Sequence, residues 1–252
     1  MYFFEKYNNI ICGLITGSLF TSISHPFHVI YIKYDRMIIN NKIKPNVMNS
    51  LHFLKKSLKN DGIKTLSKGI HIRTIQGAIS YSIIYYLKNM LNNIENQNKH
   101  IDFKLGFIEN IVFRQFMNTY LTSKINNDNI INYNILRNTF YILPITSIIR
   151  GLYFTSGMIG KDICNNVSNN SKILQGVFGC LFSLPFISFN EIITNSINNK
   201  KNIKETIINA NRGIIYSYKN TSLILREFIF LCPFIYSDEF QYIYDNKVKY
   251  II

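Results

Sequence analysis

The tripeptide Ile72-Arg73-Thr74 opens an apolar stretch that runs to about Leu91, and two similar tripeptides open apolar stretches later in the chain. These are Ile149-Arg150-Gly151 and Leu225-Arg226-Glu227. The three arginines lie 77 and 76 residues apart. A fixed interval in a chain of 252 residues predicts three copies of one structural unit, and such repeats determine the architecture of the whole chain.

Two long stretches carry no charged side chain and are long enough to cross a lipid bilayer. Residues 7–32 contain 26 consecutive positions without Asp, Glu, Lys or Arg, and residues 173–190 contain 18 more. Roughly 20 predominantly apolar residues span the hydrocarbon core of a membrane as a helix. The hydrophobic fraction of the whole chain is an ordinary 47% because polar segments separate the apolar ones. The local pattern therefore indicates an integral membrane protein.

The arginine interval and the apolar stretches together predict an all-α membrane protein with six transmembrane helices in three pseudo-symmetric two-helix repeats. The predicted helices run from residue 7 into the thirties and over about 73–91, 105–125, 138–163, 172–196 and 222–244. The segments that follow the first, third and fifth helices carry 16 Lys and Arg, whereas the other connecting and terminal segments carry 8. This asymmetry predicts an even number of spans, with both chain ends on the less basic side.

Composition and motifs argue against several other classes of protein. The net charge is +14, but no nucleic-acid-binding module accompanies it, so we predict no nucleic-acid partner. The four cysteines form no CxxC pair, which argues against a disulfide framework or a zinc site. His25 and His28 could share a helix face, but no further ligand lies nearby, and we interpret them as hydrogen-bonded histidines. No catalytic constellation or phosphate-binding loop is present, so we predict neither an enzyme nor a cofactor or metal.

The order of elements in the first repeat resembles the mitochondrial carrier superfamily. Pro26-Phe27-His28-Val29-Ile30-Tyr31-Ile32-Lys33 stands where the family has its Pro-x-acid-x-x-base motif at the end of an odd-numbered helix. Asp61-Gly62-Ile63 and Lys68-Gly69 match the family's later acid-Gly-Ile turn and basic-Gly pair. In the third repeat, Gly176-Val177-Phe178-Gly179 and Pro185-Phe186-Ile187-Ser188-Phe189-Asn190 continue the likeness. The resemblance implies a single carrier-like domain over residues 1–252, with repeats of approximately 1–92, 93–165 and 166–252.

The carrier motif is degenerate in every repeat. In working carriers the acids and bases of the three motifs form a ring of salt bridges that closes one end of the cavity. Here His28 replaces the acid of the first repeat and Tyr31 its base, while Ile187 and Asn190 replace the third pair. In the second repeat, a register with Thr119 at the proline position leaves only the base, Lys124. The resemblance therefore implies that the usual gate is lost.

His25-Pro26-Phe27-His28-Val29-Ile30 also resembles a motif of the mitochondrial carrier homologue branch, which resides in the outer mitochondrial membrane, and Leu184-Pro185-Phe186 resembles that branch's Tyr-Pro-Phe. In those relatives the histidine motif lies in a middle repeat, whereas here it lies in the first. Members of the branch are linked to inserting tail-anchored helical proteins. The resemblance implies an outer-membrane location, membrane lipids and tail-anchored or other helical membrane proteins as partners, and a role in insertion or as a scaffold.

Charged residues within the predicted helices are the candidate cavity or substrate contacts, since ionisable groups at membrane depth usually face a bundle interior. They are Glu109, Arg114, Arg150, Glu191, Arg226 and Glu227. In an insertion protein they would line a polar groove open to lipid. In an inner-membrane carrier the arginines would bind a small anionic solute. A third hypothesis is a carrier-derived partner-binding protein without either activity.

Two structural interpretations stand beside these functional ones. Arg73, Arg150 and Arg226 could instead extend their side chains to the membrane surface and anchor the helix ends there. Small residues at regular spacing let helices approach closely in membranes. We predict this packing role for Gly13, Gly17, Gly176 and Gly179.

Overall fold

The computed structural model describes residues 2–39, 46–60, 62–94, 101–125, 133–167, 171–198, 218–244 and 246, and the regular elements within these ranges are helices. They are α1 (Tyr2–Ile39), α2 (Val47–Asn60), α3 (Gly62–Leu66), α4 (Ile70–Ile94), α5 (Ile101–Glu109), the π-helix η1 (Asn110–Arg114), α6 (Gln115–Ile125), α7 (Tyr133–Val167), α8 (Lys172–Asn198), α10 (Thr221–Ile235) and α11 (Ser237–Ile243).

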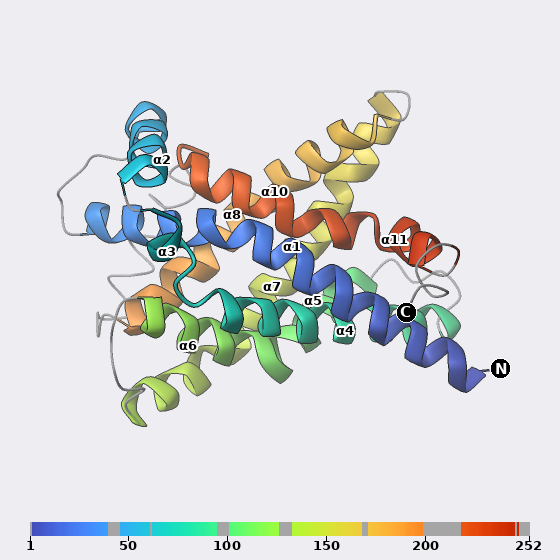
Figure 1. The fold of residues 1–252 in the computed structure, drawn as a ribbon. Helices are drawn as coiled ribbons and strands as arrows, with labels where there is room; N and C mark the ends of the chain where they lie inside the picture. Colours follow the sequence, from blue (N-terminus) through green and yellow to red (C-terminus); the bar gives the residue numbers. More distant parts are fainter. Residues whose placement is uncertain are drawn as a thin grey trace.

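The long helical segments form a closed ring. The elements α5, η1 and α6 run on from one another as a single segment from Ile101 to Ile125. In chain order, α1 contacts α4, α4 contacts α5, α5 contacts α7, α7 contacts α8, and α8 contacts α10. Contacts between α10 and α1 then close the ring, and Figure 1 shows α1 lying between α10 and α4. Each segment therefore packs against its neighbours in sequence, as consecutive helical hairpins do.

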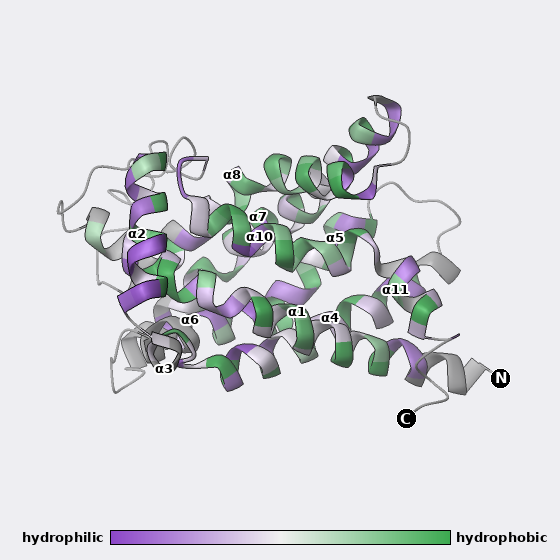
Figure 2. Ribbon diagram, turned by 45° about the horizontal axis from the view of Figure 1, so that its top comes forward, coloured by the Kyte–Doolittle hydropathy of each residue, from purple (hydrophilic) through white to green (hydrophobic). Residues whose placement is uncertain are grey.

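Three of the described helices are long and apolar enough to cross a membrane. These spans are Asn8–Tyr34 in α1, Thr139–Asn166 in α7 and Lys172–Glu191 in α8. The other segments predicted to span, α4, the α5–α6 segment and α10, are helical as expected, but α10 is only 15 residues long and the α5–α6 segment is interrupted by η1. The prediction of an all-helical membrane protein is confirmed, whereas a crossing by these three segments stays a prediction. In Figure 2 the long helices are mostly green, whereas α2 carries several purple turns.

The sixth predicted helix, residues 222–244, is not continuous. The helix α10 ends at Ile235, and a turn at Tyr236 (φ −108°, ψ 29°) separates it from α11. Pro233 lacks the N–H that would continue the helical ladder. Side chains from other helices bind carbonyl groups near this end, because Tyr85 donates to the Pro233 carbonyl at 2.8 Å and Lys161 donates to the Ile235 carbonyl at 2.9 Å. Tertiary hydrogen bonds therefore stabilise the break.

Small residues let the backbones of α1 and α4 meet. A Cβ atom added to Gly13 would lie 2.6 Å from the Ser82 Cα, and one added to Gly17 would overlap the Gly77 carbonyl. Close approach of this kind stabilises helix pairs in membranes through van der Waals packing. The third-repeat glycines differ, since a Cβ on Gly179 would lie 2.9 Å from a backbone oxygen of α7, whereas one on Gly176 would meet mainly a side chain at 3.1 Å.

The short helices α2 and α3 connect α1 to α4, and α2 touches the start of α10. The helix α2 is amphipathic, with Leu54 and Ser50 buried and Lys55 exposed. The Ser50 hydroxyl accepts a hydrogen bond from the Thr221 N–H at 2.8 Å, which joins α2 to the start of α10. The chain reverses at two glycines with left-handed φ angles of 69° and 81°, the glycines of the two turn motifs.

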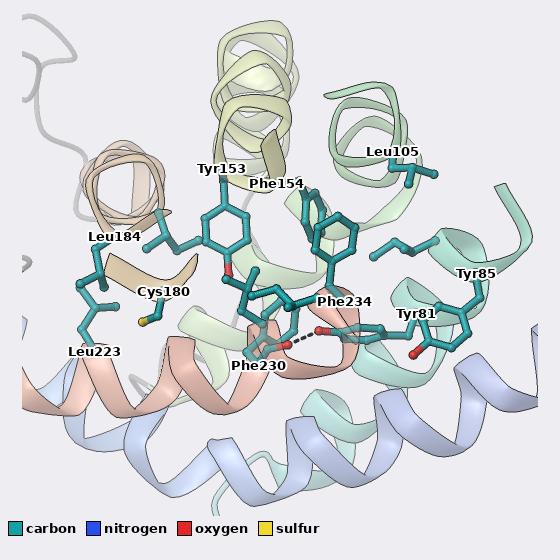
Figure 3. Close-up of a cluster of buried hydrophobic side chains, with 14 of the residues drawn as sticks. Tyr81, Tyr85, Leu105, Tyr153, Phe154, Cys180, Leu184, Leu223, Phe230 and Phe234 are labelled. Carbon is teal, nitrogen blue, oxygen red and sulfur yellow. Dashed lines mark hydrogen bonds between the residues drawn. The ribbon is translucent and has the colours of Figure 1, made fainter. Parts of the chain in front are cut away.

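Aromatic side chains fill the middle of the ring. Figure 3 shows Phe230 and Phe234 of α10 pointing toward Tyr81, Tyr153 and Phe154 from α4 and α7. The Phe154 and Phe234 rings lie with their centroids 4.1 Å apart. The Tyr81 hydroxyl donates to the Phe230 carbonyl, as the dashed line in Figure 3 marks. Phe230 therefore lies at the point where the helices converge.

A buried cluster of arginines and glutamates

The Arg and Glu side chains that are buried among the described residues form one cluster, and three of its arginines lie near the ring of Phe230. The members are Arg73, Glu109, Arg114, Arg150, Glu191, Arg226 and Glu227, and none is more than 4% exposed. The cluster contains all six predicted contact residues together with Arg73. Burying a charge is costly unless it is paired or hydrogen-bonded. The partners of each member therefore indicate what the cluster can do.

Glu109 is the carboxylate shared by two of the arginines. Its Oε2 accepts a hydrogen bond from the Arg150 Nε at 3.2 Å, and its Oε1 lies 3.4 Å from the Arg114 Nη1. Glu109 is the last residue of α5, Arg114 is the last residue of η1, and Arg150 comes from α7 across the ring. A single π-helical turn shifts the direction of the following side chains, and such turns occur often at functional sites. The π-helical turn thus brings Arg114 to the carboxylate of Glu109, the residue that precedes the turn.

Hydrogen bonds anchor the π-helical turn. The Asn110 Nδ2 lies 3.1 Å from the Thr146 Oγ1 and 3.1 Å from the Ser147 Oγ, both on α7. These contacts hold η1 against α7 next to the carboxylate of Glu109. Asn110 was not predicted as a positioning residue. In the sequence it is an ordinary polar residue within a helix, and only the π-helical turn shows its role.

Arg226 joins three helices at the other side of the cluster. Its guanidinium contacts the Glu227 carboxylate at 2.6 Å, the Glu191 Oε1 at 3.4 Å and the His28 Nδ1 at 2.8 Å. A guanidinium group can only donate hydrogen bonds, so His28 accepts through an unprotonated Nδ1 and is neutral here. Tyr153 of α7 donates to the Glu227 Oε2 at 2.6 Å. Arg226 and Glu227 therefore connect α10 with α1, α7 and α8.

Arg73 has no carboxylate within 4.0 Å among the residues whose side chains are described. Its Nη1 donates to the Gln76 Oε1 at 2.8 Å, and the Gln76 Nε2 donates to the Asn118 Oδ1 at 2.7 Å. Its Nε, fully buried, has no hydrogen-bond partner. The Arg73 Cζ lies 5.6 Å from the centroid of the Phe230 ring. Arg73 is therefore a buried cation held by amides and an aromatic ring.

Phe230 links the arginines that come from different helices. The Cζ atoms of Arg114 and Arg150 lie 4.5 Å and 5.4 Å from its ring centroid, in addition to that of Arg73. A cation near the face of an aromatic ring is stabilised by the ring quadrupole. The sequence reasoning did not select Phe230, although its position four residues after Arg226 places both on one helix face.

The interpretation of the three repeated arginines as surface anchors is wrong. Arg73, Arg150 and Arg226 are 2%, 0% and 1% exposed, and their guanidinium groups face other helices. Long basic side chains near helix ends reach the membrane surface only when no interior partner holds them. Here the carboxylates of the cluster, Gln76 and the Phe230 ring provide such interior partners.

The degenerate motif positions of the predicted first and third repeats lie on α1 and α8. The Tyr31 ring of α1 lies 4.8 Å from the Arg226 Cζ, and Ile187 packs in the apolar core of α8. Asn190 is buried with both amide atoms unpartnered, and Lys33 is half-buried. The Lys124 side chain lies outside the described residues. Pro26 and Pro185 lie within α1 and α8, both of which continue past them.

The histidines contact protein groups. His25 hydrogen-bonds through Nε2 to the Lys68 carbonyl at 2.9 Å, which holds α1 against the turn before α4. The His25 and His28 ring centroids lie 6.4 Å apart. In the part of the chain that the structure describes, no group of three His, Cys, Asp or Glu residues is arranged to hold a metal ion.

Residues 4–98 match the family model described as mitochondrial carrier protein. The match covers α1 through α4, and with the apolar helices it supports a mitochondrial integral membrane protein of the carrier superfamily, a class of transporters rather than enzymes. No curated protein and no solved structure matches the chain. The likeness to the outer-membrane branch therefore rests on two short sequence motifs, His25–Ile30 and Leu184–Phe186.

Proposed function

We propose that this chain is a mitochondrial carrier-like protein that moves a small anionic metabolite across the inner mitochondrial membrane, through the centre of the helical ring. One observation carries the proposal: four buried arginines from four helical segments converge at the middle of a closed ring. Guanidinium groups suit carboxylates and phosphates because their planar forks donate parallel hydrogen bonds. The three-repeat, six-span arrangement of the carrier family is part of this proposal.

The ion pairs of the cluster supply a means of coupling solute binding to opening. Arg226 joins α10 to α1 and α8, and Glu109 joins the α5–α6 segment to α7. An anion that competes for these arginines weakens contacts between helices. A ligand can shift a conformational equilibrium by as much as its affinity differs between the two states. The contacts around Arg226 thereby take the place of the family's salt-bridge ring. His28, Tyr31, Ile187 and Asn190 stand at positions where that ring has charged residues.

The alternative is insertion of helical membrane proteins, or a scaffold role, in the outer membrane. The His25–Ile30 motif favours it. That function needs a polar groove open to lipid between neighbouring helices. Among the described residues, every pair of neighbouring long segments is in contact. The closed ring supports the solute carrier better than the insertion protein.

Two measurements test the proposal. The protein is reconstituted in liposomes loaded with unlabelled carboxylates, and uptake of the labelled anion is measured for the wild type and for R226Q. Exchange that R226Q abolishes, while R137Q at an exposed position of α7 retains it, supports a carrier. In parallel, a protease site between α4 and α5 is probed in intact mitochondria and after outer-membrane rupture. Cleavage before rupture, together with no exchange in liposomes, would favour the outer-membrane alternative.

A further inference from the structure

We propose that the central cluster binds an anion with a single negative charge, such as a small monocarboxylate, beside Arg73. This inference rests on the proposed carrier function and specifies the class of its solute. The net charge of the buried side chains determines the charge of the anion. The arginine donors without a hydrogen-bond partner indicate where it binds.

The buried charges among the described residues do not balance. Four arginines face three glutamates, and His28 is neutral because its Nδ1 accepts a hydrogen bond from Arg226. The cluster therefore has a net charge of +1. An uncompensated charge in a protein interior is strongly unfavourable unless a counter-charge joins it. One monovalent anion neutralises the cluster, whereas a dianion would leave an excess negative charge.

The unmatched positive charge belongs to Arg73. Glu109 pairs with Arg114 and Arg150, and Arg226 contacts two glutamates, whereas Arg73 contacts the amide of Gln76. The neutral Asn118 supports that amide in turn. Amide groups can orient a guanidinium, but they cannot neutralise it. The anion should therefore bind on the Arg73 side of the cluster.

Several buried N–H donors of the arginines around Phe230 have no hydrogen-bond acceptor among the described residues. The Arg73 Nε, the Arg114 Nε and both Nη atoms of Arg150 are buried without a hydrogen-bond partner. Each of these guanidinium groups lies within 5.6 Å of the Phe230 ring centroid. The ring face compensates these charges only in part. A carboxylate that displaces the ring would accept the unmade hydrogen bonds and supply a full charge.

The test uses the full-length protein in detergent at constant ionic strength. Unfolding temperature is measured against increasing acetate, chloride and succinate. A ligand that binds the folded state raises this temperature with concentration. We expect acetate to raise it and succinate not to. An equal rise with chloride would assign the site to small monoanions in general, and a rise with acetate alone would assign it to carboxylates; both outcomes support a monovalent site.

Variants that change the buried charge by one unit make the test specific. R73Q and H28E each bring the cluster to zero net charge, so both should lose the acetate-dependent rise, while R137Q keeps it. His28 suits this change because it lies within electrostatic reach of Arg73 and Arg226. E191Q brings the cluster to +2 and should acquire a rise with succinate. R73Q removes no ion pair, so we expect it to fold. It therefore tests the inference even if E191Q fails to fold.

Two results would overturn the inference: an equal rise with succinate and acetate in the wild type, or an acetate-dependent rise that survives in R73Q. Failure here is distinguishable from failure of the carrier function. Liposome exchange that prefers dianions would leave the carrier proposal standing and remove the monovalent site. An acetate-dependent rise lost in R73Q, without exchange of any anion, would leave the site standing and remove the carrier proposal.

Discussion

Replacing Glu109 by glutamine removes the carboxylate that two buried arginines share, and it should destabilise the protein severely. Glu109 is fully buried and lies 3.2 Å from Arg150 and 3.4 Å from Arg114. Removing one partner of a buried ion pair costs about 3–5 kcal/mol because the remaining charge stays buried without compensation. At about 2–4 °C per kcal/mol for chains of this size, the unfolding temperature of E109Q should fall by roughly 6–20 °C.

The same substitution at an exposed ion pair provides the control. Glu239 lies 3.8 Å from Lys172, and the two side chains are 43% and 67% exposed. Exposed pairs contribute about 0–1 kcal/mol, so E239Q should change the unfolding temperature by roughly 4 °C or less. The double variant E109Q/R150Q removes one charge of each sign. It should lose less stability than E109Q, because only Arg114, rather than both Arg114 and Arg150, is then left without its carboxylate.

The chain carries its own reporter for this measurement. Cys12, Cys164 and Cys180 are buried, and none of the chain's cysteines forms a disulfide. A dye that becomes fluorescent on reaction with a thiol therefore reports unfolding as these cysteines become accessible. If E109Q and E239Q unfold at the same temperature, or if E109Q/R150Q is less stable than E109Q, the argument from buried charge pairing is wrong.

The same dye assay tests three smaller changes. G17A should destabilise by about 1–3 kcal/mol because its methyl group meets the backbone of α4, and G176A, which faces mainly a side chain, should lose less; equal effects would contradict the close-approach argument. Y85F removes the hydrogen bond to the end of α10 and should cost about 0.5–1.5 kcal/mol, compared with no measurable change in Y242F at an exposed position. H28A removes the acceptor for the arginine of α10 and should cost about 1–3 kcal/mol; an unchanged unfolding temperature would show that this contact does not hold α1 to α10.

The sequence predicts the framework well where local chemistry decides it. The interval between Arg73, Arg150 and Arg226 predicts three equivalent positions, and in the structure all three side chains are buried. Gly62 and Gly69 adopt the left-handed backbone conformation at which glycine is favoured. Each of these features depends on one residue type at a defined position. It can therefore be predicted without knowing the tertiary contacts.

Tertiary contacts decide the features that the sequence did not predict. The π-helical turn at Asn110–Arg114 has no periodicity that marks it in the sequence, and its hydrogen bonds go to another helix. Pro233 is visible in the sequence, but the helix ends two residues later, at Ile235. The end depends on Tyr85 and Lys161, which are far away in the chain. Likewise, the spacing of charges does not reveal which carboxylate each arginine meets.

Among the described residues, Arg73 lacks a carboxylate partner because residues 7–32 of α1 carry no charged side chain. In the predicted second repeat the arginine of the later helix pairs with a carboxylate of the earlier one, as Arg150 does with Glu109. In the predicted third repeat, Arg226 and Glu191 form the corresponding pair. In the predicted first repeat, residues 7–32 of α1 offer no carboxylate at all. The repeat that matches the carrier family best is therefore the one that leaves its arginine unpaired. A solute carboxylate can supply at Arg73 what the chain itself supplies at the two equivalent positions.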